Sequence, residues 1–257
     1  MRRRQLVELE DLAWFPAALR DAATDYLRCM LNLGDNYAPA VPVLAEALRR
    51  TSATRIVDLC AGGGGPWQRL QTALAEAGQM PTIVLTDRYP NAGAAAFLRA
   101  ANAPLSYHAA AVDAQAVPPA LIGFRTMFTA FHHFTPNAAH AVLRGAVQSG
   151  APIGIFENTQ RSLRSIALIA FSPLFVFVVM PFVRPFHWRN LFFTYLVPVL
   201  PLMVLWDGIV SCLRSYTVDE LRELGAAASV GAAYEWQAGE AWGKGPLPVT
   251  YLIGLPR

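Results

Sequence analysis

The stretch Val57-Asp58-Leu59-Cys60-Ala61-Gly62-Gly63-Gly64-Gly65 decides the fold of this chain. It follows Thr54-Arg55-Ile56, so it predicts a short buried strand that runs into a turn made of glycines. A helical pattern begins soon afterwards, at Trp67. A strand, a glycine turn and a helix in this order are typical of the first unit of a nucleotide-binding α/β sheet. Glycines let the backbone approach a ligand closely, and the helix N-terminus beyond them favours a negative group.

Two common nucleotide sites do not fit this turn. The dinucleotide fingerprint needs a small residue at its third glycine position, where the helix packs on the strand. That position falls on Trp67 or Gln68, and both side chains are too large. A P-loop ends in Gly-Lys-Ser/Thr, whereas the single lysine of the chain is Lys244. A plain tight turn is the alternative, but four consecutive glycines after an apolar strand argue against it.

The same residues resemble the first motif of the class I S-adenosylmethionine-dependent methyltransferases. That motif has an acidic residue on the strand, followed by small residues and glycines at alternate places. The resemblance implies S-adenosyl-L-methionine as the cofactor. It also implies cofactor contacts from the strand end and the turn, namely Asp58, Cys60, Ala61, Gly62, Gly63 and Gly64.

Two later strand ends are expected to complete the cofactor site. The apolar run 82–87 ends in Asp87, at the spacing where a carboxylate accepts hydrogen bonds from a ribose diol. Asp87 could instead cap the next element, and Arg88 beside it is assigned to the same site. A third strand and its exit are expected over 108–114. In the family this exit contacts adenine, which implies Asp113 and the Ala114 backbone here.

The remaining pattern gives the fold class. Strands are expected over 126–130, 152–157, 234–239 and 249–254, and helices over 136–149 and 217–228, the latter with a Thr217–Glu220 capping box. Strands that alternate with helices predict an α/β, doubly wound parallel sheet. The resemblance adds a Rossmann-like sheet of seven strands with a reversed last strand. The methyltransferase domain would comprise residues 51–160 and 215–257.

Candidate catalytic side chains follow two of these strands. Transfer of a methyl group to a hydroxyl or a protonated amine benefits from a base. His132 and His133 are candidates, since histidine titrates near neutral pH and ligands bind at strand ends. One of them could instead be a packed hydrogen-bonding residue. Glu157 is a further candidate, or else a structural carboxylate. The three cysteines are scattered and show no metal-binding or disulfide spacing, so no metal is predicted.

Residues 161–214 form a hydrophobic insert between the two parts of the domain. The runs 165–183 and 191–206 carry no charge. The connecting tip between them carries Arg184 and Arg189. As a helix the first run would reach about 28 Å, close to the ~30 Å hydrocarbon core of a bilayer. Prolines would kink either run. Because both ends join one domain, we expect a helical hairpin that spans the bilayer twice or is re-entrant. The arginines of the tip favour a hairpin that dips into one leaflet.

The location of the protein follows from the insert and its flanks. The basic residues Arg161, Arg164 and Arg214 flank it on the domain side, which places the domain on the cytoplasmic side of the cytoplasmic membrane. Asp207 is expected to mark the return of the chain to water, or else to face the acceptor pocket. The alternative is a soluble protein whose helical pair is buried under the domain or in a homodimer.

Residues 1–50 are expected to form a helical cap over the cofactor site. Pro16 suits a first helical turn, and the apolar residues that follow it fall on one face. The arginines at 2–4 could add a membrane contact. Glu8, Glu10 and Asp11 interrupt any apolar segment, so no secretory signal is predicted.

Composition narrows the function further. The chain is 54% hydrophobic and 15% charged, which is apolar for a soluble protein. A net charge of +3 fits an anionic membrane surface, but no basic patch interleaved with aromatics indicates a nucleic-acid partner. The predicted function is methyl transfer to a small-molecule or lipid acceptor held at a membrane. The alternative is a non-catalytic membrane protein that uses the fold for sensing or assembly.

Overall fold

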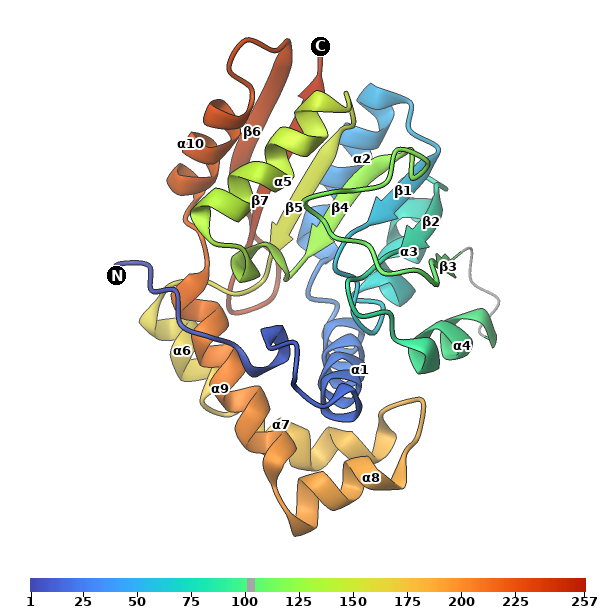
Figure 1. The fold of residues 1–257 in the computed structure, drawn as a ribbon, viewed down its shortest axis with the longest axis vertical. Helices are drawn as coiled ribbons and strands as arrows, with labels where there is room; N and C mark the ends of the chain where they lie inside the picture. Colours follow the sequence, from blue (N-terminus) through green and yellow to red (C-terminus); the bar gives the residue numbers. More distant parts are fainter. Residues whose placement is uncertain (101–104) are drawn as a thin grey trace.

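The computed structural model describes residues 1–100 and 105–257, and its seven strands in that part of the chain form one sheet (Figure 1). The strand order is β3-β2-β1-β4-β5-β7-β6, and β7 runs antiparallel to both of its neighbours. The predicted Rossmann-like, seven-stranded α/β sheet with a reversed last strand is therefore confirmed. The strands are β1 (Arg55–Asp58), β2 (Thr82–Leu85), β3 (Leu105–Tyr107), β4 (Phe124–Phe128), β5 (Ile153–Glu157), β6 (Tyr234–Ala241) and β7 (Val249–Pro256).

Helices cover both faces of the sheet because neighbouring strand residues point to opposite sides. Ile56 of β1 packs in one core with α2 (Val41–Thr51), α3 (Trp67–Glu76) and α4 (Ala92–Ala100). Val57 packs in the other core with α5 (Pro136–Gln148) and α10 (Val218–Ala228). Helix α10 begins with the predicted capping box of Thr217 and Glu220.

Two strands differ in position from the prediction. The third strand ends at Tyr107, so the range 108–114 holds only its exit, and Ala109, Ala110 and Ala111 are exposed. The strand pairing ends with the hydrogen bond from the His108 N–H to the Leu85 carbonyl. The alanines beyond it are exposed and pack against neither of these cores. Strand β4 ends at Phe128 because Thr129 takes a left-handed conformation, with φ of 49°.

The N-terminal residues lie across the carboxyl ends of the strands. A short turn, η1 (Leu9–Asp11), precedes α1 (Ala17–Leu33), which begins directly after Pro16. In Figure 1, α1 lies between the sheet and the insert. Phe15 and Tyr26 belong to a core that α1 shares with the insert.

The hydrophobic insert is a helical stretch of short segments followed by a sharply bent pair, whose second helix has 16 residues. It consists of α6 (Leu163–Ile169), α7 (Ser172–Val179), η4 (Met180–Phe182), α8 (Trp188–Leu191), η5 (Phe192–Leu196) and α9 (Val199–Arg214). Pro173 and Pro181 lie in the first turns of α7 and η4, and Pro198 precedes α9, where the axis bends by 80°. Proline lacks the amide donor that a helix interior needs, so it breaks the apolar runs at these points.

The outer side of the insert is apolar and exposed. Within the described residues, one helical stretch, Leu163–Phe182, is long and apolar enough to cross a membrane, and 28% of it is buried. The bent pair Trp188–Leu196 and Val199–Arg214 is long and apolar enough to cross a membrane only if both helices form one span. We call the exposed large apolar side chains of this region the insert surface: Leu163, Leu168, Phe171, Leu174, Phe175, Val178, Phe182, Phe186, Trp188, Phe192, Tyr195, Leu196, Val197, Leu202 and Trp206.

Candidate active site

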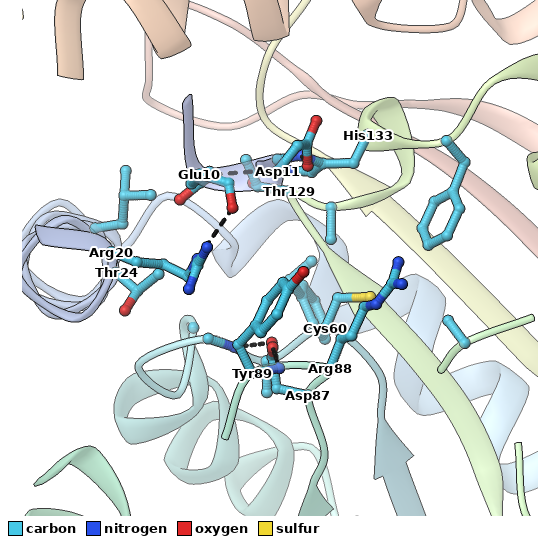
Figure 2. A pocket seen from close by; sticks show the side chains of 18 of the residues that line it. Glu10, Asp11, Arg20, Thr24, Cys60, Asp87, Arg88, Tyr89, Thr129 and His133 are labelled. Atoms are coloured by element: carbon cyan, nitrogen blue, oxygen red, sulfur yellow. Dashed lines mark hydrogen bonds and ion pairs between the residues drawn. The ribbon is translucent and has the colours of Figure 1, made fainter. Parts of the chain in front are cut away.

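A cavity of about 500 Å³ lies at the carboxyl ends of β1, β2 and β4, where the N-terminal residues cross the sheet. Figure 2 shows Cys60, Asp87 and Arg88 on one side of it and Glu10, Asp11 and His133 on the other. Helix α1 adds Arg20, Thr24 and Arg28 to the wall. Of the predicted 1–50 cap, the side chains that line the cavity lie between Gln5 and Leu31, whereas α2, which falls within the same range, packs on one face of the sheet.

The glycine turn owes its sequence to a close approach of α1. A Cβ atom on Gly63 would lie 2.6 Å from the Thr24 carbonyl oxygen, closer than any side chain tolerates. Gly62 has φ of 52°, a left-handed conformation that favours glycine. A Cβ on Gly65 would meet nothing within 4 Å, so this part of the turn faces open space.

Asp87 fixes the turn from the end of β2. Its Oδ2 accepts a hydrogen bond of 2.7 Å from the Gly62 N–H, and its Oδ1 accepts one of 2.7 Å from the Tyr89 N–H. Burial raises the pKa of Asp87, while these two bonds oppose the rise. A carboxylate oxygen has two acceptor sites, so each oxygen keeps one for a ligand in the cavity.

Arg28 ties the turn to the tip of the insert. Its guanidinium donates 2.8 Å to the Gly63 carbonyl and also donates to the Arg184 carbonyl at the tip. Asp25 balances its charge through an ion pair of 3.0 Å, and both side chains are buried. The turn, α1 and the insert are therefore joined through one side chain.

Two of the predicted cofactor residues lie behind the cavity wall. Asp58 is buried and accepts a 2.6 Å hydrogen bond from the Thr126 hydroxyl, and burial raises its pKa to about 7. The backbone of Gly64 packs against Leu98. The other eight predicted cofactor residues line the cavity: Cys60, Ala61, Gly62, Gly63, Asp87, Arg88, Asp113 and Ala114.

Glu157 and His132 form a buried pair beside the cavity. Glu157 Oε1 accepts from the N–H groups of Ala130 and Phe131, at 3.0 and 2.6 Å, and Oε2 lies 2.7 Å from His132 Nδ1. Although burial opposes ionisation, charge and hydrogen bonds from His132 lower the pKa of Glu157. Neither side chain lines the cavity.

His133 is the one predicted catalytic residue on the cavity wall. Its Nδ1 lies 2.8 Å from Asp11 Oδ1, and its Nε2 lies 3.5 Å from Glu10 Oε1. Although burial disfavours the imidazolium, the carboxylates of Glu8, Asp11 and Glu10 raise the pKa of His133 to about 10. At neutral pH the free His133 therefore carries a proton on both nitrogens, and it has to lose one before it can act as a base or bind a metal ion.

Comparisons with known proteins agree with the topology. No family model and no curated protein sequence matches the chain. The solved structure of the plantazolicin methyltransferase BpumL, in complex with SAH, matches 94% of this chain and 96% of its own at 10% identity and a TM-score of 0.57. The methyltransferase domain of bacterial CtHen1 matches 86% of this chain and 99% of its own at 12% identity and a TM-score of 0.52. This chain has a class I methyltransferase fold.

In this methyltransferase fold, the N-terminal acids are the part of the site that the sequence did not reveal. Glu10 and Asp11 line the cavity, and Asp11 Oδ2 lies 2.6 Å from Arg214 Nη1. Glu8 lies behind them, near both histidines. The sequence does show three acidic residues within positions 8–11. In the sequence they argue only against a secretory signal, because nothing there links them to the strand ends.

Asp207 does not mark a return to water, so that expectation is wrong. Its side chain is 7% exposed, and its oxygens accept from the N–H groups of Leu9, at 2.7 Å, and Glu10, at 3.4 Å. The N-terminal residues cover the aspartate because their amide groups need an acceptor there. Asp207 thus fastens the N-terminal segment to the insert.

Proposed function

We propose that this protein transfers a methyl group from S-adenosylmethionine to a small, lipophilic acceptor drawn from a membrane. The observation that carries the proposal is that the glycine turn and Asp87 line the same cavity as His133 and the N-terminal acids. One side provides a nucleoside site, and the other provides polar groups that can hold an acceptor.

The residues on the first side suit the cofactor. Asp87 keeps acceptor sites for the two hydroxyl groups of a ribose. Asp113 and Ala114 line the same cavity, at the place where the family contacts adenine. The volume of about 500 Å³ lies within the range of ~300–1,000 Å³ usual for ligand pockets. When bound, this cofactor supplies a methyl group activated on a sulfonium. BpumL, which shares the fold, holds SAH.

The residues on the second side have to align the acceptor and exclude water. Gln5, Leu6 and Val7 line the cavity and cover it from the N-terminal side. We assign His133 to contact with the acceptor, because it reaches the cavity. We assign His132 and Glu157 to the same reaction from behind the wall, as a hydrogen-bonded pair that orders the loop after β4.

The insert surface supports a membrane source for the acceptor. It presents fifteen exposed large apolar side chains, more than a surface in water usually exposes in one place. Arg164, Arg184 and Arg189 accompany them, and no acidic residue occurs from 163 to 206. An apolar face with basic neighbours is typical of segments that lie in an anionic membrane surface.

Packing favours a hairpin in one leaflet over a full crossing. The side chains of Val176, Val179 and Met203 are buried against α1, which also lines the polar cavity. A crossing would separate these helices from α1 and expose that core. We therefore infer that the insert enters the cytoplasmic leaflet, with the catalytic domain in the cytoplasm.

One experiment tests the enzyme and the source of its acceptor together. Membranes that contain the protein are incubated with methyl-labelled S-adenosylmethionine, and the lipid and aqueous fractions are extracted separately. We expect label in the lipid extract, and less of it with an Asp87→Ala variant at a cofactor concentration below saturation. Label in the aqueous fraction alone would refute the lipophilic acceptor. If the intact chain is a monodisperse dimer without detergent, the insert surface is a dimer interface.

A further inference from the structure

Glu8 is a buried carboxylate that accepts no hydrogen bond from the described residues. Its side chain is 1% exposed, and both oxygens lack a hydrogen-bond partner. An ionised carboxylate in such a place is costly unless a cation compensates it. The N-terminal segment nevertheless places Glu8 against the loop that follows β4.

The groups around Glu8 are at coordination distances rather than hydrogen-bond distances. Oε1 lies 3.7 Å from His132 Nε2, and Oε2 lies 3.5 Å from His133 Nδ1. Both exceed the normal hydrogen-bond range. Two ligands of one tetrahedral metal ion with bonds near 2.1 Å are about 3.4 Å apart. One ligand atom from each of Glu8, His132 and His133 lies within 4.8 Å of the other two.

Glu157 prepares His132 for such a bond. Because its Oε1 already accepts from two backbone N–H groups, the Glu157 carboxylate acts as an acceptor and His132 Nδ1 is the donor. The lone pair of a neutral His132 is then on Nε2 and faces Glu8 Oε1. A carboxylate that holds the far nitrogen of a histidine ligand is the usual outer partner in metal sites.

The surrounding charge also favours a divalent cation. Among the described residues, Arg214 is the permanent cation next to Glu8, with Nη1 3.3 Å from Oε1. That nitrogen donates to Asp11 at 2.6 Å instead. Glu8, Asp11, Glu157 and Asp207 are the carboxylates close to this cluster, whereas burial raises the pKa of Glu10 to about 8 and keeps it neutral at pH 7. When the histidines are neutral, as metal ligands are, these four carboxylates outnumber Arg214 together with Arg3, which donates to the His132 carbonyl.

We propose that Glu8, His132 and His133 bind a divalent transition-metal ion of the zinc type. Two imidazoles and one carboxylate suit zinc better than magnesium or calcium, which prefer oxygen ligands. Asp11 Oδ1 lies 2.8 Å from His133 Nδ1, which is a hydrogen-bond distance, so His133 binds the ion only after it gives up this proton. The ion joins the N-terminal segment to the loop after β4, and His133 puts it at the cavity wall. This proposal does not depend on the methyl-transfer function.

Calorimetric titration with ZnCl₂ tests the site. The full chain, in detergent, free of any histidine tag and stripped with a chelator, should bind one Zn²⁺ tightly. Glu8→Gln and His132→Gln should each weaken binding by roughly 100-fold or more, since they remove a ligand. Glu157→Gln should weaken it by about 10–100-fold, as expected for an outer partner. Glu46→Gln, which changes an exposed carboxylate on α2, is the matched control and should leave binding unchanged.

A second measurement keeps the test valid if a variant folds poorly. Zn²⁺ should raise the melting temperature of the unmodified chain, and a chelator should reverse the rise. Co²⁺ in its place should give the visible absorption of a nitrogen- and oxygen-bound ion. Zinc binding equal in the unmodified chain and in Glu8→Gln would overturn the proposal. A preference for Mg²⁺ would overturn it too. Loss of SAH binding in a chain that still binds zinc would contradict the proposed function alone.

Discussion

Replacement of Asp87 by asparagine is the sharpest test of the cofactor site. In the unmodified chain its two oxygens each accept a 2.7 Å bond from a backbone N–H. The amide of asparagine accepts at only one of these places and turns an NH₂ donor toward the other N–H. One buried donor is then left without an acceptor, which costs about 1–3 kcal/mol of folding stability.

The same change removes the charge that would hold the ribose hydroxyls. Loss of about 1.4–2.8 kcal/mol of binding free energy corresponds to 10- to 100-fold weaker SAH binding. Calorimetry with SAH measures the affinity, and thermal unfolding measures the stability. Asp219→Asn, on the exposed side of α10, is the matched control because it also exchanges an aspartate for an amide. Unchanged SAH affinity in Asp87→Asn would refute the assignment, and tight binding of NADH would refute the cofactor class.

Three further outcomes are expected. Alanine at His132 or His133 should lower the rate of methyl transfer by about 10²–10⁴-fold for the residue that moves the proton, with SAH affinity unchanged; normal turnover by both variants would exclude them. High salt should leave the protein on anionic vesicles, because each large apolar side chain buried contributes ~1.5–3 kcal/mol; Phe175→Glu with Leu196→Glu should release it in flotation assays, and retention would contradict the membrane proposal. Because burial raises the pKa of Asp58 to about 7 from 3.8, folding takes up a proton between these values. The stability that this provides is present below about pH 4 and is lost as the pH rises through 7, so urea unfolding of Asp58→Asn should depend less on pH across that window.

The glycine turn and the order of strands were enough to predict the sheet. Both features are local in the sequence. Few folds other than a parallel α/β sheet contain a turn of four glycines after an apolar strand, followed by apolar runs that alternate with helices. Strand β3 was misplaced because it has only three residues and lies at the sheet edge, where little side-chain burial marks it. The predicted strand also included the three alanines that follow, which are exposed and of a residue type that strands do not favour.

The acceptor side of the site was only partly predictable. His132, His133 and Glu157 follow strands, so their convergence was expected from topology. Glu8 lies far in the sequence from the histidines that it meets, and Asp207 lies far from the N-terminal amides that it accepts from. Only folding of the chain brings each of these pairs together. No spacing rule relates an irregular N-terminal segment to a sheet that begins more than forty residues later.

The position of Arg28 has a consequence for regulation. One guanidinium donates to the Gly63 carbonyl of the cofactor turn and to the Arg184 carbonyl at the tip of the insert. A ligand that orders either carbonyl reduces the ordering cost at the other, and thermodynamic linkage makes such an effect reciprocal. Lipid at the tip should thus strengthen SAH binding, and SAH should strengthen attachment to vesicles by the same factor. Equal SAH affinity with and without anionic vesicles would show that the two ends of this side chain act independently.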